Sequence, residues 1–224
     1  MNKVSRKYKK GEDRKKQLDL VIEEGRAMFT TELGLSMAKL AKRVGLNGAS
    51  SLYRYVKSKR ELWFAIIIKD FCDLSDKWEE IVNDPLMVSY KEILLEMCRF
   101  FLKLSRDDFA RFKIMFLTEP PGPVPVSTTD RGPFERSHEP RAFTIMLNTV
   151  KKAQVAGEIS TREDAFITTG IIWSFLLGTA TSVSPLYAYL GENFLSSNLP
   201  PNTNEDPRVL LHELAVKKIE ILLS

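Results

Sequence analysis

Small hydroxyl side chains, two tyrosines and several cations are crowded into VGLNGASSLYRYVKSKREL, residues 44–62. Ammonium and guanidinium groups bind phosphate oxygens, hydroxyls and phenols donate hydrogen bonds to them, and small residues let a backbone approach a groove. Seven lysines and arginines, and no carboxylate, stand between Glu32 and Glu61. These residue types favour contact with a polyanion, above all with nucleic acid.

Residue patterns for catalysis or metal binding are absent from the sequence. It contains no nucleophile elbow, phosphate loop or dinucleotide glycine motif, and no cluster of His, Cys and carboxylate residues at ligand spacing. The two histidines, His138 and His212, stand far apart. Cys72 and Cys98 lie in helical patterns without a CxxC motif, which predicts reduced core thiols in a cytoplasmic protein. We therefore expect no enzyme, no metal and no cofactor.

Charge is divided unevenly along the 224 residues. Residues 1–64 contain 16 Lys and Arg against 7 Asp and Glu, whereas residues 65–224 contain 17 against 22. A basic segment suits a polyanion and an acidic remainder does not. We expect residues 1–64 to form a basic tail and a DNA-binding domain, and residues 65–224 to form a larger second domain. The first 16 residues lack the apolar run of a secretory signal and form either a solvated tail or a DNA-contacting arm.

Apolar residues recur at helical spacing from end to end, and no alternation typical of a strand persists. The last predicted helix is capped by Asp206 and opened by Pro207. Residues 119–140 contain six prolines and are predicted to form a long loop. The sequence therefore predicts an all-α chain, with an N-terminal three-helix domain and a larger C-terminal helical domain.

Two short helices are predicted to meet at Gly45. Ser36 is placed to cap the first helix, and Gly45 ends it because a residue without Cβ adopts a left-handed turn without strain. Asn47 is placed to cap the second helix, whose inner face carries Leu52 and Val56. Such a pair, with polar groups on its outer side, is a helix-turn-helix, whose second helix enters the major groove of DNA.

A third helix is predicted to begin after Ser58, which forms a capping box with Glu61. Lys57, Lys59 and Arg60 surround its start. They form either an ordinary solvated turn or phosphate anchors at a helix N-terminus.

Residues 27–63, AMFTTELGLSMAKLAKRVGLNGASSLYRYVKSKRELW, resemble the N-terminal domain of TetR-type transcriptional regulators, and the resemblance covers residues 18–68. The family usually has one residue fewer between the turn glycine and the tyrosine than this chain has between Gly45 and Tyr53. The additional residue falls within residues 47–51. The positions that match the family pattern are Phe29, Gly34, Leu40, Ala41, Gly45, Leu52, Tyr53, Ser58, Lys59 and Leu62.

The resemblance implies a sequence-specific DNA-binding regulator, more often a repressor, that a small-molecule effector releases or modulates. By this resemblance Ser36, Tyr53 and Lys59 contact phosphates, whereas Tyr55 is either a core aromatic or a further phosphate donor. The basic N-terminus favours an alternative, a nonspecific nucleoid-type DNA-binding protein. The candidate contacts with a double-stranded operator are Ser36, Asn47, Gly48, Ala49, Ser50, Ser51, Tyr53, Arg54, Lys57 and Lys59.

Residues 165–191 carry no charged side chain and are long enough to span a bilayer. Seven Ser and Thr residues between 165 and 184, and a break at Pro185, favour a soluble helix and no membrane association. Small residues recur there every four positions, which lets two helices pack closely, either within one subunit or between two. The resemblance implies a homodimer joined by the last two long helices, about 163–183 and 206–223. Candidate interface residues are Gly170, Ser174, Gly178, Leu210, Leu214 and Ile221.

The predicted second domain is rich in phenylalanine, methionine and tryptophan. These side chains either fill the core or line a cavity, and the resemblance places an effector cavity in this domain. Aromatic walls favour a flat or hydrophobic effector. The candidate effector contacts are Phe101, Phe112, Met115, Phe116, Phe143, Met146 and Trp173.

Overall fold

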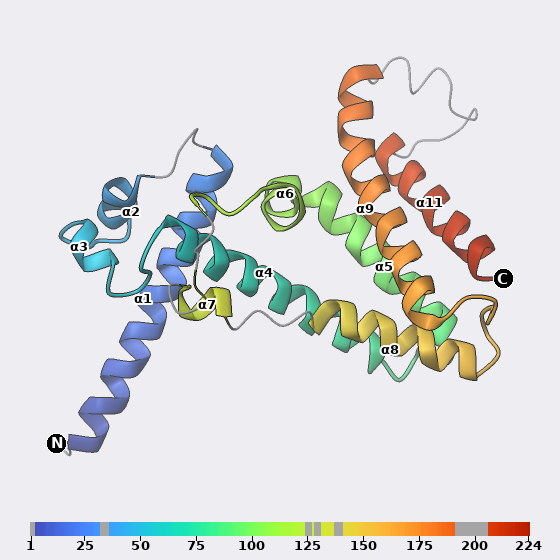
Figure 1. The fold of residues 1–224 in the computed structure, drawn as a ribbon, viewed down its shortest axis with the longest axis horizontal. Helices are drawn as coiled ribbons and strands as arrows, with labels where there is room; N and C mark the ends of the chain where they lie inside the picture. Colours follow the sequence, from blue (N-terminus) through green and yellow to red (C-terminus); the bar gives the residue numbers. More distant parts are fainter. Residues whose placement is uncertain (1–2, 32–35, 124–126, 128–130, 137–140, 191–205) are drawn as a thin grey trace. The chain divides into compact units, whose positions relative to one another are not determined.

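The computed structural model describes residues 3–31, 36–123, 127, 131–136, 141–190 and 206–224, and of residues 3–11, 31 and 184–190 only the backbone. Every regular element in these ranges is a helix, which confirms the predicted all-α fold (Figure 1). The helices are α1 (Lys3–Thr31), α2 (Met37–Arg43), α3 (Ala49–Leu52), α4 (Lys59–Val82), α5 (Tyr90–Asp107), α6 (Phe109–Leu117), α7 (Pro133–Arg136), α8 (Arg141–Val155), α9 (Ala165–Leu190) and α11 (Pro207–Leu223).

The chain divides into two compact units by its internal contacts. We call residues 1–71 and 113–139 the head, and residues 72–112 and 140–224 the body. Residue 64, where the sequence suggests a boundary, lies inside α4, and the head also takes in a segment from the middle of the chain. The assignment of DNA binding to residues 1–64, and of effector binding and dimerisation to residues 65–224, stays a prediction.

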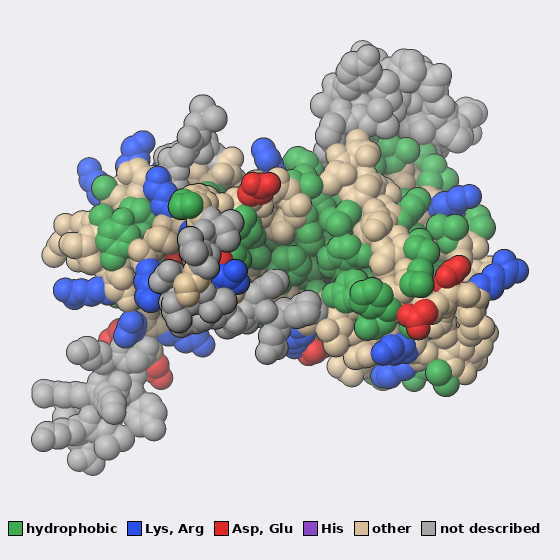
Figure 2. All heavy atoms as spheres, in the orientation of Figure 1, with side chains coloured by type: hydrophobic (Ala, Val, Ile, Leu, Met, Phe, Trp, Pro, Cys, Tyr) green, Lys and Arg blue, Asp and Glu red, His purple; other side chains and the backbone are tan. Residues whose placement is uncertain are grey.

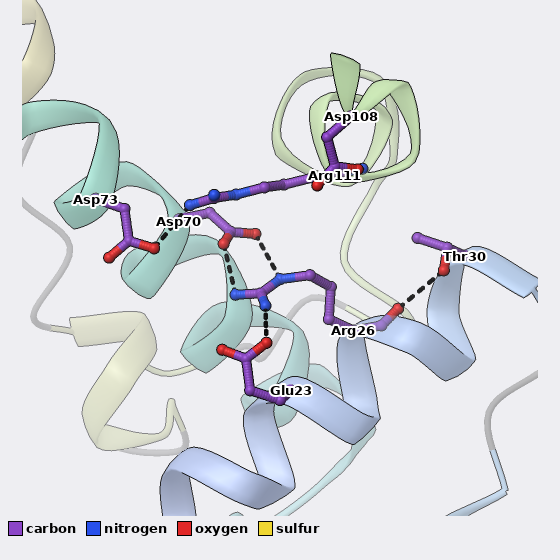
Figure 3. Close-up of polar contacts among 7 residues, drawn as sticks. All are labelled: Glu23, Arg26, Thr30, Asp70, Asp73, Asp108 and Arg111. Atoms are coloured by element: carbon purple, nitrogen blue, oxygen red, sulfur yellow. Dashed lines mark hydrogen bonds and ion pairs between the residues drawn. The ribbon is translucent and has the colours of Figure 1, made fainter. Parts of the chain in front are cut away.

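The head is built around the packing of α1 against α4. A Cβ added at Gly25 would lie 3.1 Å from both methyl carbons of Leu62, so glycine permits the close approach of the two helices. Arg26 of α1 donates hydrogen bonds to both carboxylate oxygens of Asp70 in α4 (Figure 3). The buried apolar residues of this core are Val21, Ile22, Met28, Met37, Leu40, Ala41, Val44, Leu52, Val56, Leu62, Trp63, Ala65, Ile66, Ile67 and Ile114.

The body is a helical bundle in which α5, α8, α9 and α11 pack on one another (Figure 1). The Glu158 carboxylate fastens the start of α5, because it accepts hydrogen bonds from Ser89 Oγ and from the Lys91 backbone N–H, both at 2.8 Å. At the C-terminal end of α5, Arg111 of α6 pairs with Asp73 of α4 at 2.8 Å (Figure 3). The predicted cap of the last helix is confirmed, with the Asp206 carboxylate accepting from the Arg208 N–H and Pro207 in the first turn.

The basic N-terminal segment is helical from Lys3 onward, continuous with the rest of α1. Whether it is a solvated tail or a DNA-contacting arm stays a prediction. Two other expectations about local structure are wrong. Pro185 does not end the apolar helix, since α9 continues to Leu190; a proline removes one hydrogen bond, and the neighbouring turns keep theirs. Cys72 is exposed rather than a core thiol, whereas Cys98 is buried, and burial raises its pKa to about 12.

The apolar stretch Ala165–Val183 of α9 is the single helix, among the residues described, that is long and apolar enough to cross a membrane. Its mean hydropathy is 1.5, and 28% of it is buried within the chain. A core helix of a soluble protein meets the same test, so this stretch is weak support for membrane insertion.

Candidate nucleic-acid interface

Ser36 caps the start of helix α2, as the sequence predicts. Ser36 has an extended backbone, and its side chain accepts a hydrogen bond from the Lys39 backbone N–H. Leu40 and Ala41 are fully buried against the head core, whereas Lys39 and Lys42 are exposed. The amphipathic pattern therefore fixes which side of α2 faces the solvent.

The turn after α2 has the hydrogen bonds of a Schellman motif. The Leu46 N–H donates to the Ala41 carbonyl at 2.8 Å, and the Gly45 N–H donates to the Lys42 carbonyl at 3.2 Å. Gly45 has φ +71°, which confirms the predicted left-handed terminator. Leu46 then packs against the head core and fixes the direction in which the chain leaves α2.

The start of α3 differs from the expectation that Asn47 caps it. Gly48 is the capping residue, with φ +151° and no side chain, and its carbonyl accepts from the Ser51 N–H at 3.0 Å. This backbone conformation favours glycine, so the position of Gly48 determines where the helix starts and leaves Asn47 in the turn. The turn occupies residues 44–48, which is longer than the three or four residues usual in a helix-turn-helix.

Helix α3 is also shorter than its inner apolar pair implies. It ends at Leu52, and Val56 lies beyond it, directly after a turn at residues 53–55. Leu52 and Val56 are nonetheless both buried, so the predicted inner face is correct although one helix does not carry both residues. Tyr53 directly follows the helix and is 48% exposed, whereas Tyr55 is half-buried.

Two side chains of α1 donate hydrogen bonds to the backbone on either side of α3. Gln17 Nε2 donates to the Val44 carbonyl at 2.8 Å, and an Arg14 guanidinium nitrogen donates to the Arg54 carbonyl at 3.1 Å. Sequence reasoning missed both contacts, because a polar residue on a predicted helix normally faces water. The only local signal is that Arg14 and Gln17 precede the buried positions Val21 and Ile22 by about one to two turns.

All the candidate DNA contacts belong to the head, and none of them is fully buried. Figure 2 shows Lys and Arg side chains around the region of α2 and α3. Residues of this set that are exposed are Asn47, Ser50, Tyr53, Arg54, Lys57 and Lys59, and those that are half-buried are Ser36, Gly48, Ala49 and Ser51.

The start of α4 also has exposed polar residues, Lys57, Ser58 and Lys59. Ser58 Oγ accepts from the Glu61 N–H at 3.0 Å, which forms one half of the predicted capping box. The other half is absent, since Glu61 is buried and its carboxylate accepts from the Phe134 backbone N–H at 3.0 Å. Arg60 likewise does not face the solvent with its neighbours, because it pairs with Glu135.

The residues predicted for a dimer interface lie on the exposed side of α9 and α11. A Cβ added at Gly170 or Gly178 would meet nothing within 4 Å in the chain, and Leu214 and Ile221 are 51% and 65% exposed. Ser174 is exposed and Leu210 is half-buried. Phe166, Ile167 and Ile171 extend the apolar exposure along α9, a trait of surfaces that bind another protein.

The residues predicted to contact an effector fall into two groups. Phe101, Phe112 and Met146 are buried in the body, where Trp173 lies between Phe101 and Phe143 with ring centroids 5.7 and 6.0 Å away. The remaining two, Met115 and Phe116, belong to the head instead.

Sequence reasoning missed Trp78, a fully buried member of this aromatic cluster. Its ring lies 6.1 Å from that of Trp173, and its indole N–H has no hydrogen-bond partner. One surface groove of the body, of about 360 Å³, lies between α9 and α11, and another of about 270 Å³ lies beside Tyr90. Neither groove is lined by the predicted effector contacts.

Comparison with known proteins gives partial sequence matches and full-length structural ones. No family model matches the chain. Over 116 residues it is 25% identical to an HTH-type transcriptional regulator of Mycobacterium bovis and to one of Mycobacterium tuberculosis. These matches span 50% of the chain and 49% of each relative, so the chain spans about half the length of the curated relatives it matches.

The structural matches cover nearly the whole chain. The transcriptional regulator FadR of Bacillus subtilis, in complex with stearoyl-CoA, has a TM-score of 0.62 at 14% identity, over 89% of this chain and 96% of that one. A TetR-family regulator from Shewanella has a TM-score of 0.59 at 12% identity, over 90% and 97%. At such low identity these matches show the fold.

Proposed function

We propose that this chain, which has the fold of TetR-family transcriptional regulators, binds double-stranded DNA sequence-specifically and regulates transcription. The observation that carries the proposal is the row of exposed polar residues between Asn47 and Lys59, on a segment whose Leu52 and Val56 are buried in the head core. A helix-turn-helix uses such a segment to place the start of its second helix in the major groove.

Different residues of this segment approach the bases, contact them or bind phosphates. The half-buried Gly48 and Ala49 have small or absent side chains, which lets the backbone at the start of α3 approach the base edges. Ser50 is exposed there and places a hydroxyl against the bases. Lys57 and Lys59 bind phosphates on one side and Ser36 on the other, which sets the orientation of α3 on the duplex.

Two heads are needed for tight and selective binding, since one α3 of four residues reads few base pairs. We propose a homodimer formed through α9 and α11. The open space at Gly170 and Gly178, beside exposed apolar residues of both helices, lets a second copy approach the helix backbones. A symmetric dimer then addresses two half-sites about 34 to 36 Å apart.

The body is proposed to bind a small-molecule effector, of hydrophobic or aromatic character, among its buried aromatic rings. Support comes from FadR, solved in complex with stearoyl-CoA, and from RolR, solved in complex with resorcinol. The unpartnered Trp78 indole N–H supplies a hydrogen-bond donor for such a molecule. The effector shifts DNA affinity only if it binds one subunit arrangement better than the other.

We propose repression rather than activation, in the cytoplasm where the DNA lies, and no catalytic role. The test is footprinting on the DNA flanking the chain's own gene. Protection of two half-sites one helical turn apart is the expected result. Uniform protection at all sequences would instead support the nonspecific nucleoid-type alternative.

A further inference from the structure

Residues 131–136, which we call the strap, come from the proline-rich segment between α6 and α8 and belong to the head, where they pack on its core. Phe134 packs against the head core, and its backbone N–H donates to the Glu61 carboxylate. Gly132 is buried, and an added Cβ there would lie 1.4 Å from Glu61 Oε2. The strap therefore has one close-fitting position on the first turn of α4.

The strap brings Glu135 against Arg60. Arg60 Nη2 lies 2.8 Å from Glu135 Oε1, and Arg60 Nε lies 3.3 Å from both carboxylate oxygens. The side chains are 14% and 7% exposed, so water and salt screen this pair little. The guanidinium also lies 5.3 Å from the centre of the Phe64 ring, and the Arg131 guanidinium stands 3.9 Å from the same carboxylate.

Arg60 is largely buried and paired with a carboxylate, whereas the two lysines near it are exposed. Lys57 and Lys59 are exposed at the start of α4, where a helix N-terminus favours phosphate. Arg60 is the third cation of this turn, and a free guanidinium here would add a contact to phosphate whatever the base sequence. A charge-assisted forked pair with a carboxylate competes directly with that contact.

We propose that the strap withholds Arg60 from DNA through Glu135, and thereby keeps the head's affinity for nonspecific DNA low. Glu135 is a specificity-determining residue that acts through Arg60, by removing one sequence-independent phosphate contact. This inference rests on the proposed DNA-binding function.

The experiment measures binding of a labelled random-sequence 30-base-pair duplex by the full-length protein, as fluorescence anisotropy over a series of salt concentrations. The variants are Glu135→Gln, Arg60→Gln, the double variant, and Gly132→Ala, which displaces the strap without changing charge. Glu119→Gln is the matched control, because it removes one exposed carboxylate from the same proline-rich segment. Circular dichroism checks that each variant keeps its helix content.

Freeing Arg60 should add one phosphate contact. For Glu135→Gln we expect the slope of log K against log salt to become more negative by about 0.9, with roughly five-fold tighter binding at 0.1 M salt. Gly132→Ala should change the slope in the same direction, whereas Arg60→Gln, the double variant and Glu119→Gln should keep the wild-type slope.

Two results would overturn the inference while leaving DNA binding intact. One is an unchanged slope for Glu135→Gln and Gly132→Ala. The other is a slope for Arg60→Gln less negative by about 0.9, which would make Arg60 a phosphate contact in the wild type. If the wild-type protein itself binds no duplex in a salt-dependent manner, it is the proposed function that fails.

Discussion

Arg26 and Asp70 join the first and fourth helices of the head through two hydrogen bonds, Nε to Oδ2 at 3.1 Å and Nη2 to Oδ1 at 2.6 Å (Figure 3). The Asp70 side chain is fully buried and that of Arg26 is 15% exposed. Burial lowers the pKa of Arg26, but the Asp70 carboxylate and then Glu23 outweigh it and raise that pKa overall. The pair fixes how α1 lies on α4, and hence how Gln17 and Arg14 reach the turn before and after α3.

Replacing Arg26 with alanine should strongly destabilise the head. The change leaves the Asp70 carboxylate buried without this partner, which costs about 3 kcal/mol in free energy of unfolding. Urea denaturation followed by circular dichroism measures the loss. Glu23→Gln is the control, since Glu23 pairs with the same arginine but is 53% exposed and should cost less than about 1 kcal/mol. Equal losses for the two variants would refute a structural role for the buried pair.

Substitutions of Lys59 and Ser50 should have different effects, the first on affinity for all DNA and the second on preference for the operator. Lys59→Ala removes a phosphate contact, so it should weaken binding to every duplex alike and make the salt slope less negative by about 0.9. Ser50→Ala should keep that slope and lower the preference for the operator about five-fold, an effect of about 1 kcal/mol.

Anisotropy titrations with operator and random duplexes measure both quantities. Lys113→Ala, at an exposed cation of α6 in the same unit, controls for the loss of charge and should change neither. If Ser50→Ala instead weakens all duplexes equally, Ser50 is no base contact.

Gly178→Leu should separate folding of the subunit from its assembly. A Cβ added at Gly178 meets nothing within 4 Å in the chain, so we expect the subunit to accept a leucine there, which also favours the helix. The same side chain would hold apart two copies that pack through α9, and we expect a monomer with unchanged helix content.

Sedimentation velocity measures the state of assembly. Lys151→Leu, which adds a leucine at an exposed position of α8, is the control and should stay dimeric. A dimer of wild-type strength in Gly178→Leu would place the interface elsewhere.

His212 should make the body less stable in acid. Burial, followed by the nearby Arg106 cation, lowers the pKa of His212 to about 4, although Asp206 and Asp107 act in the opposite direction. The unfolded chain, with the ordinary value of about 6.5, therefore binds the proton first as pH falls. The contribution is complete above about pH 6.5 and is lost as pH falls towards 4, by about 1 to 2 kcal/mol between pH 7 and pH 5.

His212→Phe removes this titration and fills a similar volume. The difference in unfolding free energy between variant and wild type should therefore grow in the variant's favour from pH 7 to pH 5. A difference that is the same at both pH values would show that His212 does not titrate between the folded and unfolded states.

Much of the fold is set by local chemistry that the sequence displays. The helix starts at Ser36 and after Asp206 could be predicted because a short side chain caps its own backbone two or three residues later. The glycine terminator at Gly45 is of the same kind. Burial of Leu52 and Val56 follows from spacing alone, even though α3 ends at Leu52.

Two kinds of feature could not be predicted from the sequence. One is a contact between residues far apart in the chain, and the other is which of two adjacent residues begins a helix. The Arg60 and Glu135 side chains are 75 residues apart, and no periodicity connects them. Asn47 and Gly48 both suit a helix start, and only the backbone conformation of Gly48 decides between them. The sequence predicts only that Trp78 is a core residue. That its indole N–H has no hydrogen-bond partner depends on how the helices pack around it.

The central claim is selective recognition of DNA by the surface around α3. The most direct measurement is the ratio of dissociation constants for a random duplex and for an equally long duplex from the DNA flanking the chain's own gene, by anisotropy at one fixed salt concentration. We predict a ratio of about 10³ or more for the fragment that contains the operator. A ratio near unity for every fragment tiled across that region would contradict the account.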